Sequence, residues 1–266
     1  MKKILTLISI CTLFVLFGCT LPSGVDVTQR YNVNDTYYYL YVADGMNVTV
    51  TDEVDVIVIT GDENVMEKIK VELTSSTLRI FRKDISLAYP NTTEVLIPYN
   101  PRLREVEVGM DSEFHTEFGI GDPDLKSKVT VTSRGKFDGY VEAQDLDLIV
   151  KDNSDAICYY DVYDKLYLKV QNSSSVEMHG NAENLELNLS DYAEIENTWN
   201  GNYYSCWCNY CYGSVDTYST ARVDCDEEIS VSVTQGSYLY YSGDPYIGDS
   251  YVDGTSDMEH SGGWGK

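Results

Sequence analysis

The chain has 266 residues and a formal charge of −24, with 43 acidic and 19 basic side chains. Such an acidic balance excludes nucleic acid as a natural partner and favours cations, neutral glycans or basic protein surfaces. The length is sufficient for one elongated domain or two compact ones.

Residues 1–18, MKKILTLISICTLFVLFG, have the organisation of an export signal. Two lysines precede an apolar stretch that is too short for an ordinary transmembrane helix. Residues 16–19 (LFGC) resemble the lipobox of bacterial lipoproteins, which implies cleavage before Cys19 and acylation of that cysteine. Thr20 stands where an Asp would favour the inner membrane, so the resemblance implies the outer membrane, facing either the cell surface or the periplasm. The alternative is a plain signal peptide that precedes a cysteine.

Residues 19–36 are predicted to be a lipidated tether and lead-in, and residues 37–100 an antiparallel β region. Segments such as YYYLYV and VDVIVIT alternate in polarity, and turn signals such as ADG and GD separate them. Short connections of this kind favour antiparallel pairing.

Residues 101–260 contain a repeat whose period, about 20 residues, lies at the short end of the range for solenoid repeats. Alternating segments begin at Leu146, Leu166 and Leu185, and each is followed by a polar turn and a further apolar residue. Strands repeated at this period without helices predict a stacked β-coil, in which each rung of a β-helix or solenoid buries the apolar face of its neighbour. The predicted fold class is therefore all-β, and the alternative is an ordinary β-sandwich with similar strands. Residues 261–266 are predicted to be a frayed C-terminus.

Several further short segments are not catalytic motifs but are shared with a known family: residues 48–50, 56–58, 61–64, 78–80, 95–98 and 241–245, with Leu103 and Gly254. In these segments and in the repeat the chain resembles the head GIN domain family of autotransporter adhesins. The resemblance covers most of the mature chain and implies an exported β-domain with a role in adhesion.

Five cysteines of the mature chain follow the lipobox cysteine: Cys158, Cys206, Cys208, Cys211 and Cys225. The spacing of the last four invites a zinc interpretation. Starting a rung at Tyr204 instead aligns Cys206 with Leu187 and Cys208 with Leu189, so that both thiols point into the core as small apolar groups. Core packing or disulfide pairing is favoured over a metal site.

A ladder of carboxylates is predicted on adjacent rungs of the coil. If Ile157, Val176, Ile195 and Val215 face inward, the residues that follow them face outward: Cys158, Glu177, Glu196 and Asp216. Like charges at about 5 Å repel each other mildly. A cation such as Ca²⁺ or a basic partner would relieve this repulsion, whereas the alternative is a solvated face that resists aggregation.

Aromatic side chains are the second candidate contact surface. Tyr167 and Trp207 are predicted at outward strand positions, and Trp199 and Tyr203 in an adjoining loop. Exposed aromatic rings of this kind are suited to stacking on sugar rings or to contacting a protein partner.

The three histidines, His115, His179 and His260, have no accompanying nucleophile motif, and the sequence predicts no catalytic residues. No cofactor is predicted apart from the Ca²⁺ option. The predicted function is that of an outer-membrane lipoprotein, held by its N-terminal lipid, that presents a rigid acidic β-rod for adhesin-like, non-catalytic binding. A carbohydrate-active enzyme or glycan-binding module on a β-helix and a structural protein of envelope assembly are the alternatives, and the oligomeric state is left open.

Overall fold

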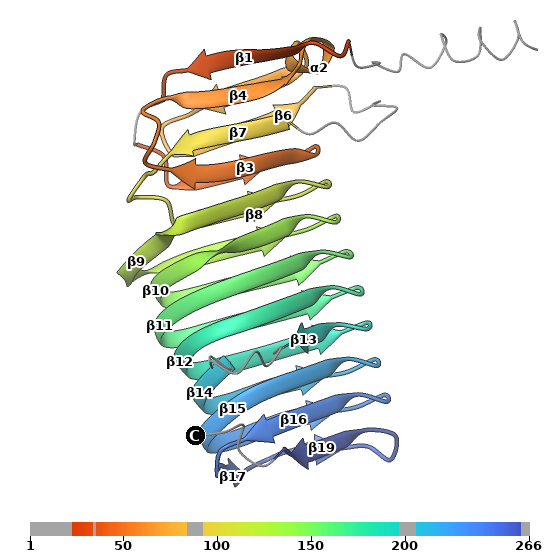
Figure 1. The fold of residues 1–266 in the computed structure, drawn as a ribbon. Coiled ribbons are helices and arrows are strands. Elements are labelled where there is room, and N and C mark those ends of the chain that lie inside the picture. Colours follow the sequence, from red (N-terminus) through yellow and green to blue (C-terminus); the bar gives the residue numbers. More distant parts are fainter. Residues whose placement is uncertain (1–22, 34–35, 84–92, 197–205, 262–266) are drawn as a thin grey trace, which may run out of the picture.

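The computed structural model describes residues 23–33, 36–83, 93–196 and 206–261, which form an all-β rod (Figure 1). Strands stack along the long axis of the rod, from the N-terminal region at one end to the last strands at the other. Within those four ranges no helix has the length and apolar character needed to cross a membrane. Cys19 and the leader lie outside the described residues.

A parallel β-solenoid makes up most of the rod, which confirms the predicted fold class. Its strands, in chain order, are β8 (Glu105–Val108), β9 (Glu113–Val131), β10 (Lys136–Lys151), β11 (Asp155–Gln171), β12 (Ser175–Ser190), β13 (Glu194–Glu196), β14 (Cys206–Val215), β15 (Thr220–Val233), β16 (Tyr238–Ser242), β17 (Tyr246–Ile247), β18 (Tyr251–Val252) and β19 (Asp257–His260). Every pairing among these strands is parallel.

The register of the repeat is the one that the sequence predicts. Leu146 of β10 lies beside Leu166 of β11, which in turn lies beside Leu185 of β12. Because all three side chains are fully buried, one position of the repeat forms a continuous apolar row along the axis of the rod.

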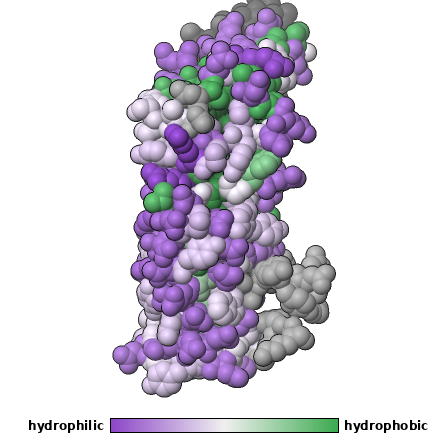
Figure 2. All heavy atoms as spheres, turned by 90° about the vertical axis from the view of Figure 1, so that its left-hand side faces the viewer, coloured by the Kyte–Doolittle hydropathy of each residue, from purple (hydrophilic) through white to green (hydrophobic). Residues whose placement is uncertain are grey.

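Each rung has two faces joined by a corner. The first face consists of residues 113–117, 136–142, 155–161 and 175–181 in successive rungs, and the second of residues 126–131, 145–151, 165–171 and 184–190. Register shifts at the corner, for example between Ala143 and Asp145, let one long strand serve both faces. Figure 2 shows the corner edge, which is mostly hydrophilic along the solenoid and exposes more apolar surface towards the N-terminal end.

The second face of one rung leads into the first face of the next through a tight turn with two residues at positive φ. Asp152 and Asn153 form one such turn, with φ of 64° and 62°. Asp and Asn tolerate this left-handed region better than most residues, which explains the Asn- and Asp-rich turns of the repeat. A buried serine usually follows, and the Ser174 hydroxyl accepts a hydrogen bond from the Ser154 amide of the rung before it at 3.1 Å. Ser174, Ser219 and Ser237 each satisfy in this way a backbone donor that the turn would otherwise bury unpaired.

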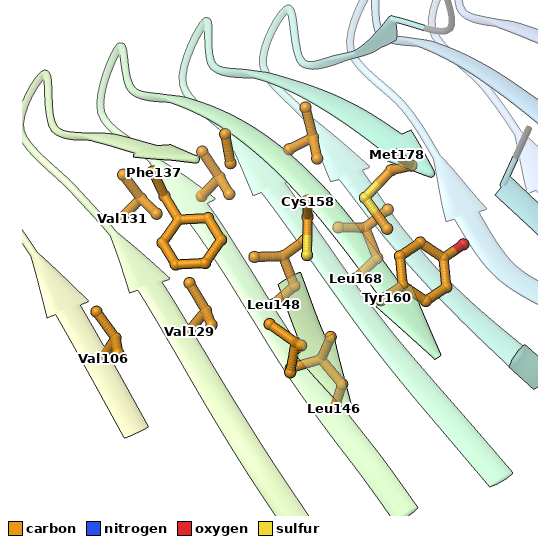
Figure 3. Close-up of a cluster of buried hydrophobic side chains, with 14 of the residues drawn as sticks. Val106, Val129, Val131, Phe137, Leu146, Leu148, Cys158, Tyr160, Leu168 and Met178 are labelled. Atoms are coloured by element: carbon orange, nitrogen blue, oxygen red, sulfur yellow. The ribbon is translucent and has the colours of Figure 1, made fainter. Parts of the chain in front are cut away.

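The core between the two faces is apolar from rung to rung (Figure 3). Phe114 and Phe137 stack with ring centroids 5.5 Å apart, and Leu148 lies beside Leu168 on the next rung. Along each strand buried and more exposed residues alternate, so every second side chain of either face points into the core. Burial on this scale is the main stabilising contribution to a rod of this kind.

The N-terminal region contains β1 (Asp26–Tyr31), β2 (Tyr39–Val42), β3 (Met46–Thr51), β4 (Ile57–Asp62), α2 (Glu63–Met66), β5 (Ile69–Leu73), β6 (Thr77–Arg82) and β7 (Thr93–Pro98). The expectation of an antiparallel region holds only in part. β4 pairs antiparallel with β1 and β7, and β5 with β6, but β2 pairs in parallel with β6 and β8, and β3 with β7 and β9.

The parallel pairs have a physical cause. β2 and β3 are the two sides of a rung that stacks directly on the solenoid, so their neighbours are strands distant in sequence rather than hairpin partners. The predicted tether is also shorter than expected, because residues 26–31 form β1 on the outer side of β4. A single apolar cluster runs from Tyr37 to Leu239 and crosses residue 100 without a break.

Candidate functional site

The predicted carboxylate ladder is present in part. Glu177 of β12 and Glu196 of β13 are neighbours in the parallel register, as expected, and the preceding Val176 and Ile195 are buried. The Glu177 carboxylate contacts Nε2 of His179 at 2.9 Å. Only the backbone of Glu196 belongs to the described structure.

Asp216 is not the third member of the ladder. It follows β14 at the turn edge, where its amide donates to the Leu189 carbonyl at 2.9 Å. The strand beside β13 on the next rung is instead β15, with Glu194 next to Thr220, and Arg222 of β15 lies 3.5 Å from the Glu194 carboxylate. The prediction was wrong here because residues 197–205 between β13 and β14 interrupt the period on which the alignment depended.

The same alignment misassigned Ile157 and Cys158. The residue beside Val176 is Ala156, so Ile157 points outward and is 36% exposed, whereas Cys158 is fully buried. A run of three consecutive small or apolar residues, Ala156 to Cys158, fits either phase of the strand period, and the neighbouring rungs decide between them.

The two described aromatic candidates lie on different faces. Tyr167 is on the second face, between Asp147 and Glu186 of the adjacent rungs. Trp207 is on the first face near the corner, beside Asn181 of the preceding rung. Its Nε1 donates to the Asp226 carboxylate at 3.2 Å. Trp199 and Tyr203 lie outside the described residues, and the structure therefore brings none of the predicted aromatic residues together.

All five described cysteines are buried as thiols. Cys206 and Cys208 do point into the core, but beside Gly180 and Ala182 of β12 rather than the predicted Leu187 and Leu189. The Tyr160 hydroxyl donates to the Cys206 sulfur at 3.2 Å, and burial raises the pKa of the Cys206 thiol to about 12. Thiols held in this state are inert core groups, since thiolate is the reactive form.

No group of three or more His, Cys, Asp or Glu side chains within the described ranges is arranged to hold a metal ion. Cys225 lies beside Cys208 on the next rung, and the carbonyls of Asn209 and Glu228, at 3.2 and 3.3 Å from its sulfur, are the two acceptors within reach of its single S–H. These contacts use the sulfur as a weak hydrogen-bond donor.

A surface groove of about 370 Å³ lies on the first face, across β3, β9, β10 and β11. Its outward side chains form two rows that cross the rungs: Asn47, Glu113, Lys136 and Asp155 in one, and Thr49, His115, Asp138 and Ile157 in the other. Each row carries an ion pair or hydrogen bond between neighbouring rungs, with Lys136 Nζ 2.7 Å from Glu113 and His115 Nδ1 3.0 Å from Asp138. The charged side chains of the groove are therefore paired with one another across the rungs.

A third row beside the groove carries rings. Tyr140, Tyr159 and His179 are neighbours on β10, β11 and β12, and the rings of Tyr159 and His179 stack with centroids 4.8 Å apart. Tyr159 remains 45% exposed. The Tyr140 hydroxyl donates to Asp161 at 2.7 Å, and its pKa is raised by burial and by this hydrogen bond.

A fourth row completes the outer surface of the first face with Glu142, Asp161, Asn181 and Trp207. Asn181 Nδ2 donates to Asp161 at 3.1 Å, and the Tyr163 hydroxyl donates to Glu142 at 2.8 Å. Sequence reasoning missed these rows, apart from Trp207 and from Glu177, which continues the second row beside Ile157. Placing Ala156 inward would have revealed the alternation of outward rings and carboxylates on β10 and β11.

Comparison with solved structures finds relatives of the same fold. A structure from Parabacteroides merdae, described as a putative adhesin, has 15% sequence identity and a TM-score of 0.75, covering 90% of this chain and 97% of that one. A structure from Parabacteroides distasonis, described as a putative lipid binding protein, has 16% identity and a TM-score of 0.70, with coverage of 90% and 97%. A putative adhesin from Bacteroides fragilis has 19% identity and a TM-score of 0.59, with coverage of 90% and 98%.

Comparison with curated proteins finds no significant match. The family described as "Putative auto-transporter adhesin, head GIN domain" matches residues 36–245, which span the N-terminal region and most of the solenoid. Because their sequence identities are so low, the solved structures show the fold alone, whereas the family match covers more than half of the sequence. The chain therefore belongs to the autotransporter adhesin head GIN domain family.

Proposed function

We propose that this protein is an exported lipoprotein, anchored in the outer membrane through acylated Cys19, that binds its ligand without catalysis in an adhesin-like role. The observation that carries the proposal is the parallel stack of described strands from β8 to β19 along one apolar core. Such a stack fixes outward side chains in rows at about 4.8 Å intervals, which suits recognition of an extended surface.

The attachment of the first strand supports an anchor at the N-terminal end of the rod. Ser23 and Gly24 both contact the Asp62 carboxylate, at 3.0 and 2.8 Å, and β1 begins at Asp26. These contacts lower the pKa of Asp62 and dock the chain only four residues after Cys19. A lipid on Cys19 would hold the N-terminal end of the rod close to the membrane and leave the solenoid faces accessible.

The outer surface of the first face is the part of the described structure best suited to binding. It combines the groove, the internally paired charges and the exposed ring of Tyr159. The family and the structural relatives described as adhesins support a binding role of this kind.

The anchor is tested by expressing the full chain and a Cys19→Ser variant in a Gram-negative host, with labelling by an alkyne fatty acid and fractionation of membranes. We expect label and outer-membrane recovery for the natural chain, and loss of both for Cys19→Ser. Recovery of the natural chain in the soluble fraction without the fatty-acid label would contradict the proposal. Thr20→Asp is the matched control, because it keeps the acylated cysteine and is expected to move the labelled protein to the inner membrane.

A further inference from the structure

We propose that the outer surface of the first face binds a neutral, linear glycan that lies along the rod axis, with Tyr159 as its main ring contact. The proposal rests on the non-catalytic binding role proposed above and names its ligand class and its site. It concerns four rows of outward side chains on β9, β10, β11 and β12.

The charge of the surface selects a neutral ligand over an anionic one. Lys136 and His115 at the groove each face a carboxylate, Glu113 at 2.7 Å and Asp138 at 3.0 Å. Asp155 adds a further negative charge to the same row and accepts from the Ser175 hydroxyl at 2.8 Å. An acidic polysaccharide or a phosphate-rich surface would meet net repulsion here.

The polar groups match the hydroxyls of a sugar. Asp161 accepts hydrogen bonds from Tyr140 and Asn181, one on each carboxylate oxygen, and each oxygen keeps a lone pair for a further donor. The Asn181 amide and the Glu142 carboxylate flank it in the same row. A neutral glycan offers both O–H donors and oxygen acceptors, so it can bond to carboxylate and amide groups without bringing a charge.

The apolar groups match the C–H faces of a sugar. Tyr159 and Ile157 are exposed on an otherwise polar strand face, at 45% and 36%. The stack on His179 fixes the Tyr159 ring before any ligand arrives, which reduces the entropy lost on binding. Trp207, one rung beyond Asn181, adds a further ring at the corner side of the same surface.

The spacing of the rows distinguishes a glycan from a peptide. Successive rungs present equivalent side chains at intervals of about 4.8 Å, whereas an extended peptide repeats on one side only at intervals of about 6.8 Å. A pyranose unit in an extended chain advances by nearly one rung. A linear glycan along the axis can therefore place one sugar unit over each of β10, β11 and β12, whereas the side chains of an extended peptide fall out of step with the rungs.

The test uses purified residues 20–266 without the lipid, and affinity electrophoresis followed by calorimetry. The probes are three neutral polysaccharides, a β-glucan, a mannan and a xylan, with polygalacturonate as the acidic comparison. Tyr159→Ala removes the proposed ring contact. Tyr218→Ala is the matched control, since Tyr218 is also exposed and also stacked, on Tyr192 at the turn edge.

We expect at least one neutral polysaccharide to bind, with affinity about ten-fold or more weaker for Tyr159→Ala and changed less than two-fold for Tyr218→Ala. Circular dichroism and thermal unfolding establish that both variants fold. Failure of the folded natural chain to bind any neutral probe, preference for polygalacturonate, or equal loss in both variants would overturn the proposal. A dimer that Tyr159→Ala dissociates would also overturn it, because the face would then be occupied by a second copy. None of these results changes the Cys19 labelling result, so the two proposals fail separately.

Discussion

The N-terminal region and the solenoid differ in the kind of side chain that they bury. In the solenoid, each rung adds apolar side chains to the same rows, and its turns are closed by serine hydroxyls that accept from backbone amides. The N-terminal region instead buries a charged group: Arg82 is only 5% exposed and donates to the Thr93 hydroxyl at 2.7 Å and to the Gly45 carbonyl at 3.2 Å.

The difference shows two ways of specifying a β-structure. A solenoid rung is specified by its neighbours, so the same short pattern can be repeated, whereas the first rung must end the stack with strands of mixed direction. There the buried Asp44 carboxylate accepts from the Arg82 amide at 3.0 Å, and a polar network of fixed geometry replaces the repeated row. We expect the two regions to respond differently to substitution.

Replacing Arg82 should have the largest effect. Burial lowers the pKa of Arg82 and the nearby Asp44 carboxylate partly offsets this, so Arg82→Met leaves a buried carboxylate without its cation. We expect a loss of about 3–5 kcal/mol in the free energy of unfolding, measured by urea titration. Arg79→Met, at an exposed position of the same strand, is the control. Equal effects of the two variants would show that the network contributes no special stability.

Within the solenoid, Gly213→Ala should be a strongly damaging small change. Gly213 has φ of 123°, and a Cβ there would lie 2.0 Å from the Leu187 carbonyl oxygen of the preceding rung. The strain should cost about 2–3 kcal/mol in urea titration, because the backbone of two stacked rungs must separate. Gly254→Ala, with no atom within 4 Å of its Cβ position, should change stability little. A neutral Gly213→Ala would mean that the rungs are less tightly stacked than described.

The serine turns should contribute a smaller amount at each rung. Ser174→Ala leaves the buried Ser154 amide without its acceptor, and we expect a loss of about 1–2 kcal/mol in thermal or urea unfolding. Ser173→Ala, one residue earlier and exposed, serves as the control. If the two variants were equally stable, the serine hydroxyls would not be the groups that stabilise the buried backbone amides of the turns.

The smallest effect concerns the exposed pair of Arg134 and Asp111 on consecutive turns. Arg134 donates to both carboxylate oxygens, at 2.6 and 2.7 Å, and this hydrogen bonding lowers the pKa of Asp111. A lowered carboxyl pKa stabilises the folded state above the unfolded value near 3.9, and the contribution is lost as the pH falls through the folded pKa. The natural chain should therefore melt slightly above Arg134→Gln at pH 6, and the two melting temperatures should converge once the pH has fallen below the lowered pKa of Asp111. If the difference in melting temperature persisted at low pH, it would be due to the packing of the Arg134 side chain rather than to its charge.

The parts of the fold that could be predicted from the sequence are those where neighbours repeat. The register of Leu146, Leu166 and Leu185 can be read from the sequence because they occupy equivalent positions on successive rungs. β2 and β3 look like hairpin strands in the sequence, since local alternation carries no information about a partner that is distant along the chain.

The candidate site was harder to predict because its position depends on the phase of a single strand. Choosing Ile157 rather than Ala156 as inward hides the outward row that contains Tyr159, and the rungs around it are needed to settle the choice. Beyond β13 the period lengthens by the residues that precede β14, so alignment by period misplaced Cys206 and Asp216. Trp207 was assigned correctly to an outward position because both of its neighbours, Cys206 and Cys208, are buried.

The proposed adhesin-like role requires the solenoid to be accessible outside the cell, and antibody access on intact cells tests this requirement most directly. An epitope inserted at the exposed turn of Tyr218, on the turn edge and away from the first face, would be probed with antibody on intact and on lysed cells. The account predicts staining of intact cells at nearly the level of lysed cells, and loss of cell-associated staining with Cys19→Ser. Staining that appears only after lysis would place the rod inside the envelope and contradict an adhesin-like role.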